Sequence, residues 1–257
     1  MKALKNLMLV AVVVGTMTVM GARSFAGPLP PSFPEVWNPG NYVMGQSTLA
    51  STDPDYLGSI YDLEIDWVVM FLGPAPAGNP FGIPAGTPVW GYYYQIENSS
   101  TTVVGSFTIT TPGPPFVAAT SVEADLDAGT ATDPLNPSFT IPAHNVAGET
   151  EAATAGTAFP ITGVPALSLT SVTYSFQPPP FGPGKKMPTG WESEILIAYA
   201  LVPPTYGRAG ALDNTPPSPW ASRPYGEPVP VPSPEPAVTM LLGIGTLLGA
   251  VMLRRRK

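Results

Sequence analysis

The stretch SIYDLEIDWVVMFL, residues 59–72, decides the fold that we expect for this chain. In its first half, large apolar residues alternate with Asp62, Glu64 and Asp66, which is the period of a β-strand with one buried face. From Val68 onward the stretch is entirely apolar, and such a run is typical of a strand buried on both faces. We therefore expect a long strand that lies against water at one end and inside the protein at the other.

Similar patterns on either side of this stretch predict an all-β protein. They are rich in β-branched and aromatic residues and are separated by turn residues, whereas no segment between the two chain ends has a helical period. We expect an antiparallel β-sandwich of about 6–8 strands. A polar turn at residues 98–100 predicts that the strands before and after it form a hairpin. Strand signals begin near Tyr42, and further strands are expected at residues 89–97, 101–110, 117–126, 167–176 and 191–201, with long loops between residues 127 and 162.

The N-terminal end has the three parts of a secretory signal peptide. Lys2 and Lys5 precede an apolar run, and small residues follow at the positions that signal peptidase reads. We expect cleavage between Ala26 and Gly27, so that residues 1–26 are removed after passage through the secretion translocon. The alternative is an N-terminal membrane anchor that is not cleaved.

A change in composition follows the expected β-sandwich domain of residues 27–202. Residues 203–233 are rich in proline and end in the sequence VPVPS. Proline lacks an N–H group and favours the extended polyproline conformation, so we expect a linker that holds the domain away from its point of attachment.

The C-terminal end, residues 234–257, reads as a membrane-spanning signal. Pro234, Glu235 and Pro236 are followed by residues 237–253, which are 17 residues without a charge. As a helix they would extend about 25 Å at about 1.5 Å per residue, which is the short end of what crosses a bilayer. Four cations then end the chain and are expected to stay in the cytoplasm; they are Arg254, Arg255, Arg256 and Lys257.

A Pro-Glu-Pro tripeptide, a short apolar helix and a terminal arginine cluster, in this order, resemble the PEP-CTERM sorting signal of Gram-negative bacteria. The resemblance covers residues 232–257, and Ser233 stands where valine is common. It implies recognition by exosortase, a membrane-embedded cysteine transpeptidase-like enzyme, after a transient stay in the inner membrane. It also implies a final location at the cell surface or in the extracellular matrix, in association with exopolysaccharide and biofilm. A simple C-terminal anchor is the alternative.

Composition excludes several classes of activity. The chain has no cysteine, which excludes thiol catalysis, disulfides and cysteine-based metal sites. Residues 27–236 contain four cationic and 18 acidic residues, a net charge of −14. Such a surface repels nucleic acid, so we expect no nucleic-acid partner.

Two groups of acidic residues at alternate positions are the candidate metal ligands. In strands, each group would place three carboxylates on one face, where they could form a solvated acidic surface, bind Ca²⁺ or serve as a glycosidase pair. No cofactor other than Ca²⁺ is suggested. The candidates are Asp62, Glu64 and Asp66 in one group and Glu123, Asp125 and Asp127 in the other.

The remaining candidates favour structural roles. His144 is the only histidine and lies in a loop-like context without a nucleophile motif, so we expect a loop or surface histidine and no catalytic residue. The aromatic residues could form a sugar-binding platform but are expected in the core. We therefore expect a non-enzymatic surface or matrix protein. The alternatives are an extracellular carbohydrate-active enzyme and a module that binds Ca²⁺ or carbohydrate.

Overall fold

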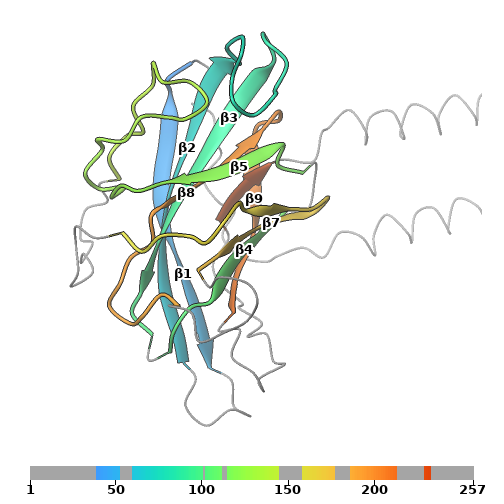
Figure 1. Cartoon of the computed structure of the whole chain (residues 1–257). Coiled ribbons are helices and arrows are strands. Elements are labelled where there is room, and N and C mark those ends of the chain that lie inside the picture. Colours follow the sequence, from blue (N-terminus) through green and yellow to red (C-terminus); the bar gives the residue numbers. More distant parts are fainter. Residues whose placement is uncertain are drawn as a thin grey trace, which may run out of the picture. The chain divides into compact units, whose positions relative to one another are not determined.

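The computed structural model describes residues 39–52, 60–100, 102–111, 115–144, 158–176, 186–212 and 229–232. These residues form ten β-strands and no helix, which confirms the all-β class and corrects the expected 6–8 strands (Figure 1). Among them, no helix has the length and apolar character that spanning a membrane requires. The predicted signal peptide, its cleavage site and the C-terminal sorting segment lie outside the described residues.

The first sheet, sheet 1, has five antiparallel strands in the order β1-β2-β3-β8-β5. The stretch that decides the fold is β2, at the second position of this order. Its pairing with β3 shifts between Phe71 and Gly73, where a positive φ of 72° at the glycine permits a β-bulge. The strands are β1 (Tyr42–Thr52), β2 (Ile60–Pro74), β3 (Pro88–Asn98), β5 (Ala118–Val122) and β8 (Ile195–Ala200).

The second sheet, sheet 2, also has five antiparallel strands, in the order β10-β9-β4-β7-β6. Its strands are β4 (Ser106–Thr110), β6 (Ala166–Leu167), β7 (Ser171–Ser175), β9 (Pro204–Leu212) and β10 (Val229–Pro232).

The predicted hairpin across residues 98–100 is wrong. β3 pairs with β2 and β8 in sheet 1, whereas β4 pairs with β7 and β9 in sheet 2. The polar residues hold a crossover between the sheets: the Asn98 side chain donates to the carbonyls of Thr102 and Met187, and the Asp62 amide donates to Ser100 Oγ. Local turn chemistry therefore does not decide which strand the chain pairs with next.

The linker prediction for residues 203–233 is also wrong where the structure describes them, because β9 and β10 belong to sheet 2. β10 is an edge strand, the position at which a missing proline N–H costs no ladder hydrogen bond. In its sequence Val-Pro-Val-Pro, Val229 and Val231 are fully buried, and the Tyr94 hydroxyl of sheet 1 donates to the Pro230 carbonyl at 2.6 Å. The alternation of valine and proline that suggested a linker thus belongs to a β-strand.

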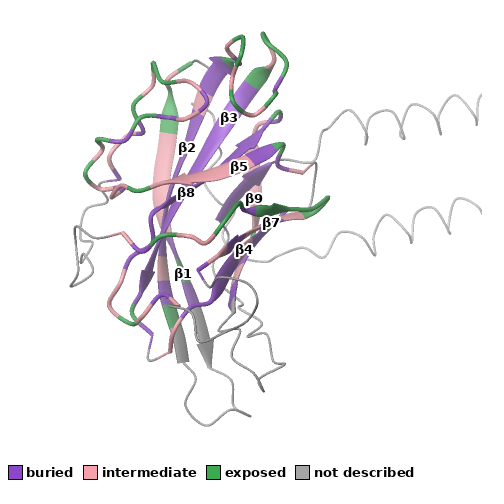
Figure 2. Ribbon diagram, in the orientation of Figure 1, coloured by how far each residue is buried: buried purple, intermediate pink, exposed green. Residues whose placement is uncertain are grey.

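One hydrophobic cluster contains residues of both sheets, and we call the face of sheet 1 that carries it the inner face. It includes Ile65 of β2, Tyr92 of β3, Phe107 of β4 and Val172 of β7. The Tyr174 hydroxyl of β7 donates to the Ile197 carbonyl of β8 and adds a polar link between the sheets. Figure 2 shows this burial as nearly continuous along β3 and β8.

A second cluster covers the opposite, outer face of sheet 1. Val68 and Met70 of β2 and Tyr93 of β3 pack there against a long loop after β5 that supplies Leu126 and Ile141. The expectation that the apolar half of the stretch is buried on both faces is confirmed. The loop over the outer face, residues 123–144, is the part of the fold that completes the candidate site.

Candidate functional site

The first residue of the site, Asp66, lies at the point where the outer face of β2 changes from polar to apolar. It is 1% exposed, and its cross-strand neighbour Gln46 donates from Nε2 to Asp66 Oδ1 at 3.0 Å. The pattern of residues 59–72 places it there: the two preceding acidic positions are nearer the exposed end, and the next outer-face residue is the buried Val68.

The second residue, Asp127, is supplied by the loop that follows β5. The backbone N–H of Leu126 donates to Gln95 Oε1 of β3 at 2.8 Å, which attaches the loop to sheet 1. The Asp127 N–H donates to Asp125 Oδ1 at 2.8 Å and closes a tight turn. Its side chain is 21% exposed, so this carboxylate is the part of the site nearest to solvent.

The third residue, His144, ends the described part of the same loop and is 2% exposed. Its backbone N–H donates to the Leu126 carbonyl at 3.1 Å, so the parts of the loop around Leu126 and His144 lie side by side. Its ring Nε2 lies 3.0 Å from the carbonyl oxygen of Gly45 in β1. Because a carbonyl oxygen only accepts, this bond places a proton on Nε2. We expected a loop or surface histidine: the loop position is confirmed, and the surface position is wrong, because the residue is buried.

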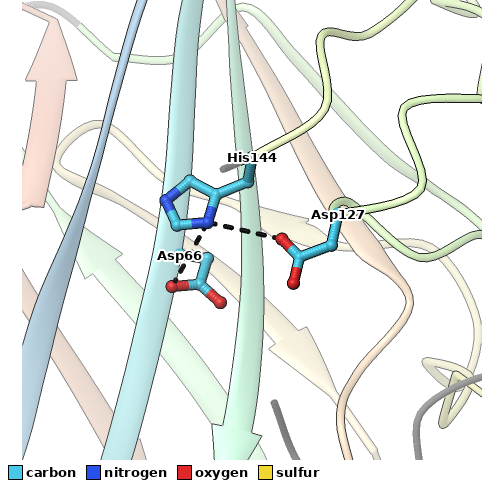
Figure 3. Close-up of side chains that lie close together, drawn as sticks. All are labelled: Asp66, Asp127 and His144. Atoms are coloured by element: carbon cyan, nitrogen blue, oxygen red, sulfur yellow. Dashed lines mark ion pairs between the residues drawn. The ribbon is translucent and has the colours of Figure 1, made fainter. Parts of the chain in front are cut away.

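The three side chains converge on one point (Figure 3). His144 Nδ1 lies 3.4 Å from Asp127 Oδ1 and 3.7 Å from Asp66 Oδ1. One ligand atom from each residue lies within 4.8 Å of the others. Two carboxylates and an imidazole nitrogen thus share a buried space.

The structure separates the members of the two acidic groups. Asp62 and Glu123 are exposed, and Glu64 and Asp125 are intermediate. Only the third member of each group, Asp66 or Asp127, enters the shared site. The second group does not lie on a strand, because β5 ends at Val122 and the chain turns away before Glu123. The expectation that the second group places three carboxylates on one face of a strand is therefore wrong.

Nothing in the local sequence identifies His144 as a partner of these carboxylates. Its ring partner Gly45 is 99 positions away, and the segment around it has no strand or helix pattern. A single histidine in an apolar-proline context, Ile141-Pro142-Ala143-His144, is the one signal that could have suggested burial. This sequence context does not indicate which side chains lie beside the imidazole ring.

A second buried polar cluster anchors the same loop. Asp133 Oδ2 accepts hydrogen bonds from the Tyr93 and Tyr199 hydroxyls at 2.8 and 2.9 Å, and its Oδ1 accepts from the Leu135 and Asn136 backbone N–H groups. Burial raises the pKa of Asp133, although these hydrogen bonds oppose the shift. Burial also raises the pKa values of Tyr93 and Tyr199, so both remain hydroxyl donors. The side chains of Asp133, Tyr93 and Tyr199 are fully buried, so we assign the cluster a structural role.

The aromatic residues are in the core, as expected, and do not form a sugar-binding platform. Six aromatic residues were candidates for such a platform. Five of them are at most 6% exposed, and the sixth, Trp191, is half-buried against the hydrophobic cluster between the two sheets. The five are Trp67, Trp90, Tyr92, Tyr93 and Tyr94.

No family model matches the chain, and neither the curated proteins nor the solved structures include one with significant similarity to it.

Proposed function

We propose that this chain is an exported, non-catalytic protein of the cell surface or extracellular matrix that is sorted and processed by an exosortase. The observation that carries the proposal is the order of three parts at the C-terminal end. Pro234, Glu235 and Pro236 precede 17 uncharged residues, and four cations follow. The leader of residues 1–26 supports entry into the same export route.

The position of β10 supports the proposal in a specific way. This strand ends at Pro232, so only Ser233 separates it from the Pro-Glu-Pro tripeptide. We propose that the two sheets form a β-sandwich and that this folded body extends to the sorting signal without a stalk. Exosortase would then act on a short segment directly after an edge strand, beside the inner membrane.

The burial of the acidic site favours a non-catalytic body over a glycosidase. A glycosidase needs two carboxylates that both reach the substrate, at about 5–9.5 Å from each other. Asp66 and Asp127 are near the lower limit, with ligand atoms within 4.8 Å, but Asp66 is 1% exposed and beneath the loop. A sugar ring has no access to this pair.

The test compares two Glu-Pro sequences in the same segment of the chain. Glu235→Ala changes the sorting tripeptide, and Glu227→Ala is the matched control, because Glu227 also precedes a proline but follows a glycine. Intact-mass analysis of surface and matrix fractions from the producing bacterium should show a product without residues 237–257 for the wild type and for the control. Glu235→Ala should accumulate in the inner membrane with Arg254 to Lys257 attached.

Two results would contradict the proposal. One is a surface form of the wild type that retains the cationic tail, which would make the segment a simple anchor. The other is release of reducing ends from the native exopolysaccharide by the purified protein, lost on Asp127→Asn, which would make the body a glycosidase.

A further inference from the structure

We infer that Asp66, Asp127 and His144 form a binding site for a divalent transition-metal ion, and that Zn²⁺ is the ion their ligand set fits best. The donors are two carboxylate oxygens and one imidazole nitrogen. Zn²⁺ binds this combination, with Zn–N and Zn–O distances of about 2.0–2.2 Å.

Two of the three donor–donor distances are close to those around a tetrahedral ion. Four ligands at about 2.1 Å from Zn²⁺ lie about 3.4 Å from one another. His144 Nδ1 is 3.4 Å from Asp127 Oδ1 and 3.7 Å from Asp66 Oδ1. The ligand atoms of Asp66 and Asp127 lie within 4.8 Å of each other, so an ion between the three atoms requires an adjustment of these side chains.

The orientation of the imidazole is the second, independent observation. Metal-binding histidines typically donate the N–H of their other ring nitrogen to a carbonyl or a carboxylate, which directs the unprotonated nitrogen at the metal. The Nε2 of His144 makes this contact with the Gly45 carbonyl at 3.0 Å. In the neutral ring Nδ1 then presents a lone pair to the two carboxylates, an arrangement that a cation makes favourable.

The surroundings hold the donors in place. Gln46 of β1 donates to Asp66 Oδ1 at 3.0 Å, and the Leu126–His144 backbone bond keeps the two loop ligands together. The donors thus come from a strand and from two separate parts of the loop over the outer face, residues 123–144. A bound ion would join this loop to β2, and the 21% exposure of the Asp127 side chain places the site near the protein surface.

The chemistry of the site distinguishes Zn²⁺ from Ca²⁺. Ca²⁺ takes six to eight oxygen ligands at about 2.3–2.6 Å, and a nitrogen donor is unsuited to it. Positive charge between two carboxylates stabilises them when they lie side by side in a buried space. An imidazolium would supply one positive charge, and a metal ion with a neutral imidazole would supply two.

The experiment uses the full chain, purified in detergent with a tag free of histidine and treated with a chelator. Calorimetric titration with Zn²⁺ should give one ion per chain, and the same titration with Ca²⁺ should give no saturable binding at this site. Asp127→Asn and His144→Ala should each lower the Zn²⁺ affinity at least tenfold. Asp62→Asn is the matched control, because Asp62 is an exposed carboxylate on the same strand; it should leave the affinity unchanged.

The single histidine provides a readout that does not depend on how well a variant folds. All imidazole ¹⁵N signals belong to His144, because no other histidine is present. Zn²⁺ should shift Nδ1 from the position of an unprotonated nitrogen to that of a coordinated one while Nε2 stays protonated. The inference is overturned if both nitrogens are protonated and insensitive to Zn²⁺, or if Asp127→Asn binds Zn²⁺ as tightly as the wild type.

Discussion

The buried carboxylate of Asp133 offers the sharpest test of how the loop over the outer face, residues 123–144, is attached to sheet 1. Tyr93→Phe and Tyr199→Phe each remove one hydroxyl donor, at 2.8 or 2.9 Å from Asp133 Oδ2, without changing the aromatic packing. A hydrogen bond contributes about 0.5–1.5 kcal/mol, and about 1.5–3 kcal/mol when one partner is charged. Each single variant should therefore lower the free energy of unfolding at pH 7 by about 0.5–3 kcal/mol.

The double variant should show strong coupling between the two tyrosines. Both hydroxyls donate to the same oxygen, so the second removal leaves Asp133 Oδ2 without either of these two donors. Contacting groups of this kind typically have coupling energies of about 0.5–3 kcal/mol. A double-mutant cycle by urea unfolding of residues 27–236, followed by tryptophan fluorescence, measures the coupling.

The pH dependence has a defined sign. Burial raises the folded-state pKa of Asp133 above its ordinary value of 3.8, so its contribution to stability is greatest below that value and falls as the pH rises through the folded-state pKa. The tyrosine hydrogen bonds oppose this rise, so their removal raises the pKa further. The Tyr→Phe variants should therefore lose more stability at pH 7 than at acidic pH.

The control is Tyr42→Phe, because Tyr42 is 44% exposed and should change stability by less than about 0.5 kcal/mol. Losses below about 0.5 kcal/mol for both Tyr93→Phe and Tyr199→Phe at pH 7 would refute the reasoning. So would a loss that grows as the pH falls.

Three further substitutions test other parts of the fold by urea unfolding. Gly207→Ala places a Cβ 2.6 Å from the Val231 side chain and 2.7 Å from the Thr110 carbonyl oxygen, so it should loosen β10 and cost about 1–3 kcal/mol. Asn79→Ala removes a side chain that donates to two carbonyls and accepts from two N–H groups in the turn after β2, and should cost about 1–3 kcal/mol. Gly129→Ala, at a φ of 57° and 2.8 Å from the backbone of the facing segment, should distort the loop over the outer face and lower Zn²⁺ affinity. Unchanged stability, or for Gly129→Ala unchanged affinity, would contradict each expectation.

The local pattern of the chain was sufficient for the class of fold and for the buried strand β2. The change from alternating to fully apolar residues at Val68 predicted a strand with two buried faces, because side chains alternate across a strand whatever it packs against. The same reasoning located the regions of β1 to β5, β7 and β8 but not those of β9 and β10, and it placed the six candidate aromatic residues in or against the core. The two targeting segments at the chain ends are expected from the sequence alone, and both stay predictions.

The pairing of strands was not predictable from these patterns. The polar turn at residues 98–100 suits a hairpin, but the chain crosses there to sheet 2, where β4 finds its partners β7 and β9. The Val-Pro alternation of residues 229–232 suits a linker, but an edge position tolerates proline and buries the two valines. In both cases the deciding contacts come from strands distant in sequence.

The candidate site shows the same division. Sequence identified Asp66 and Asp127 as members of acidic groups, because carboxylates at alternate positions are visible in the chain. The sequence did not distinguish these two residues from the other four acidic candidates. It also did not predict that His144 lies beside them, because no local pattern shows which side chains a loop covers. Only the packing of residues 123–144 over the outer face of sheet 1 decides that two carboxylates and the one imidazole are buried together.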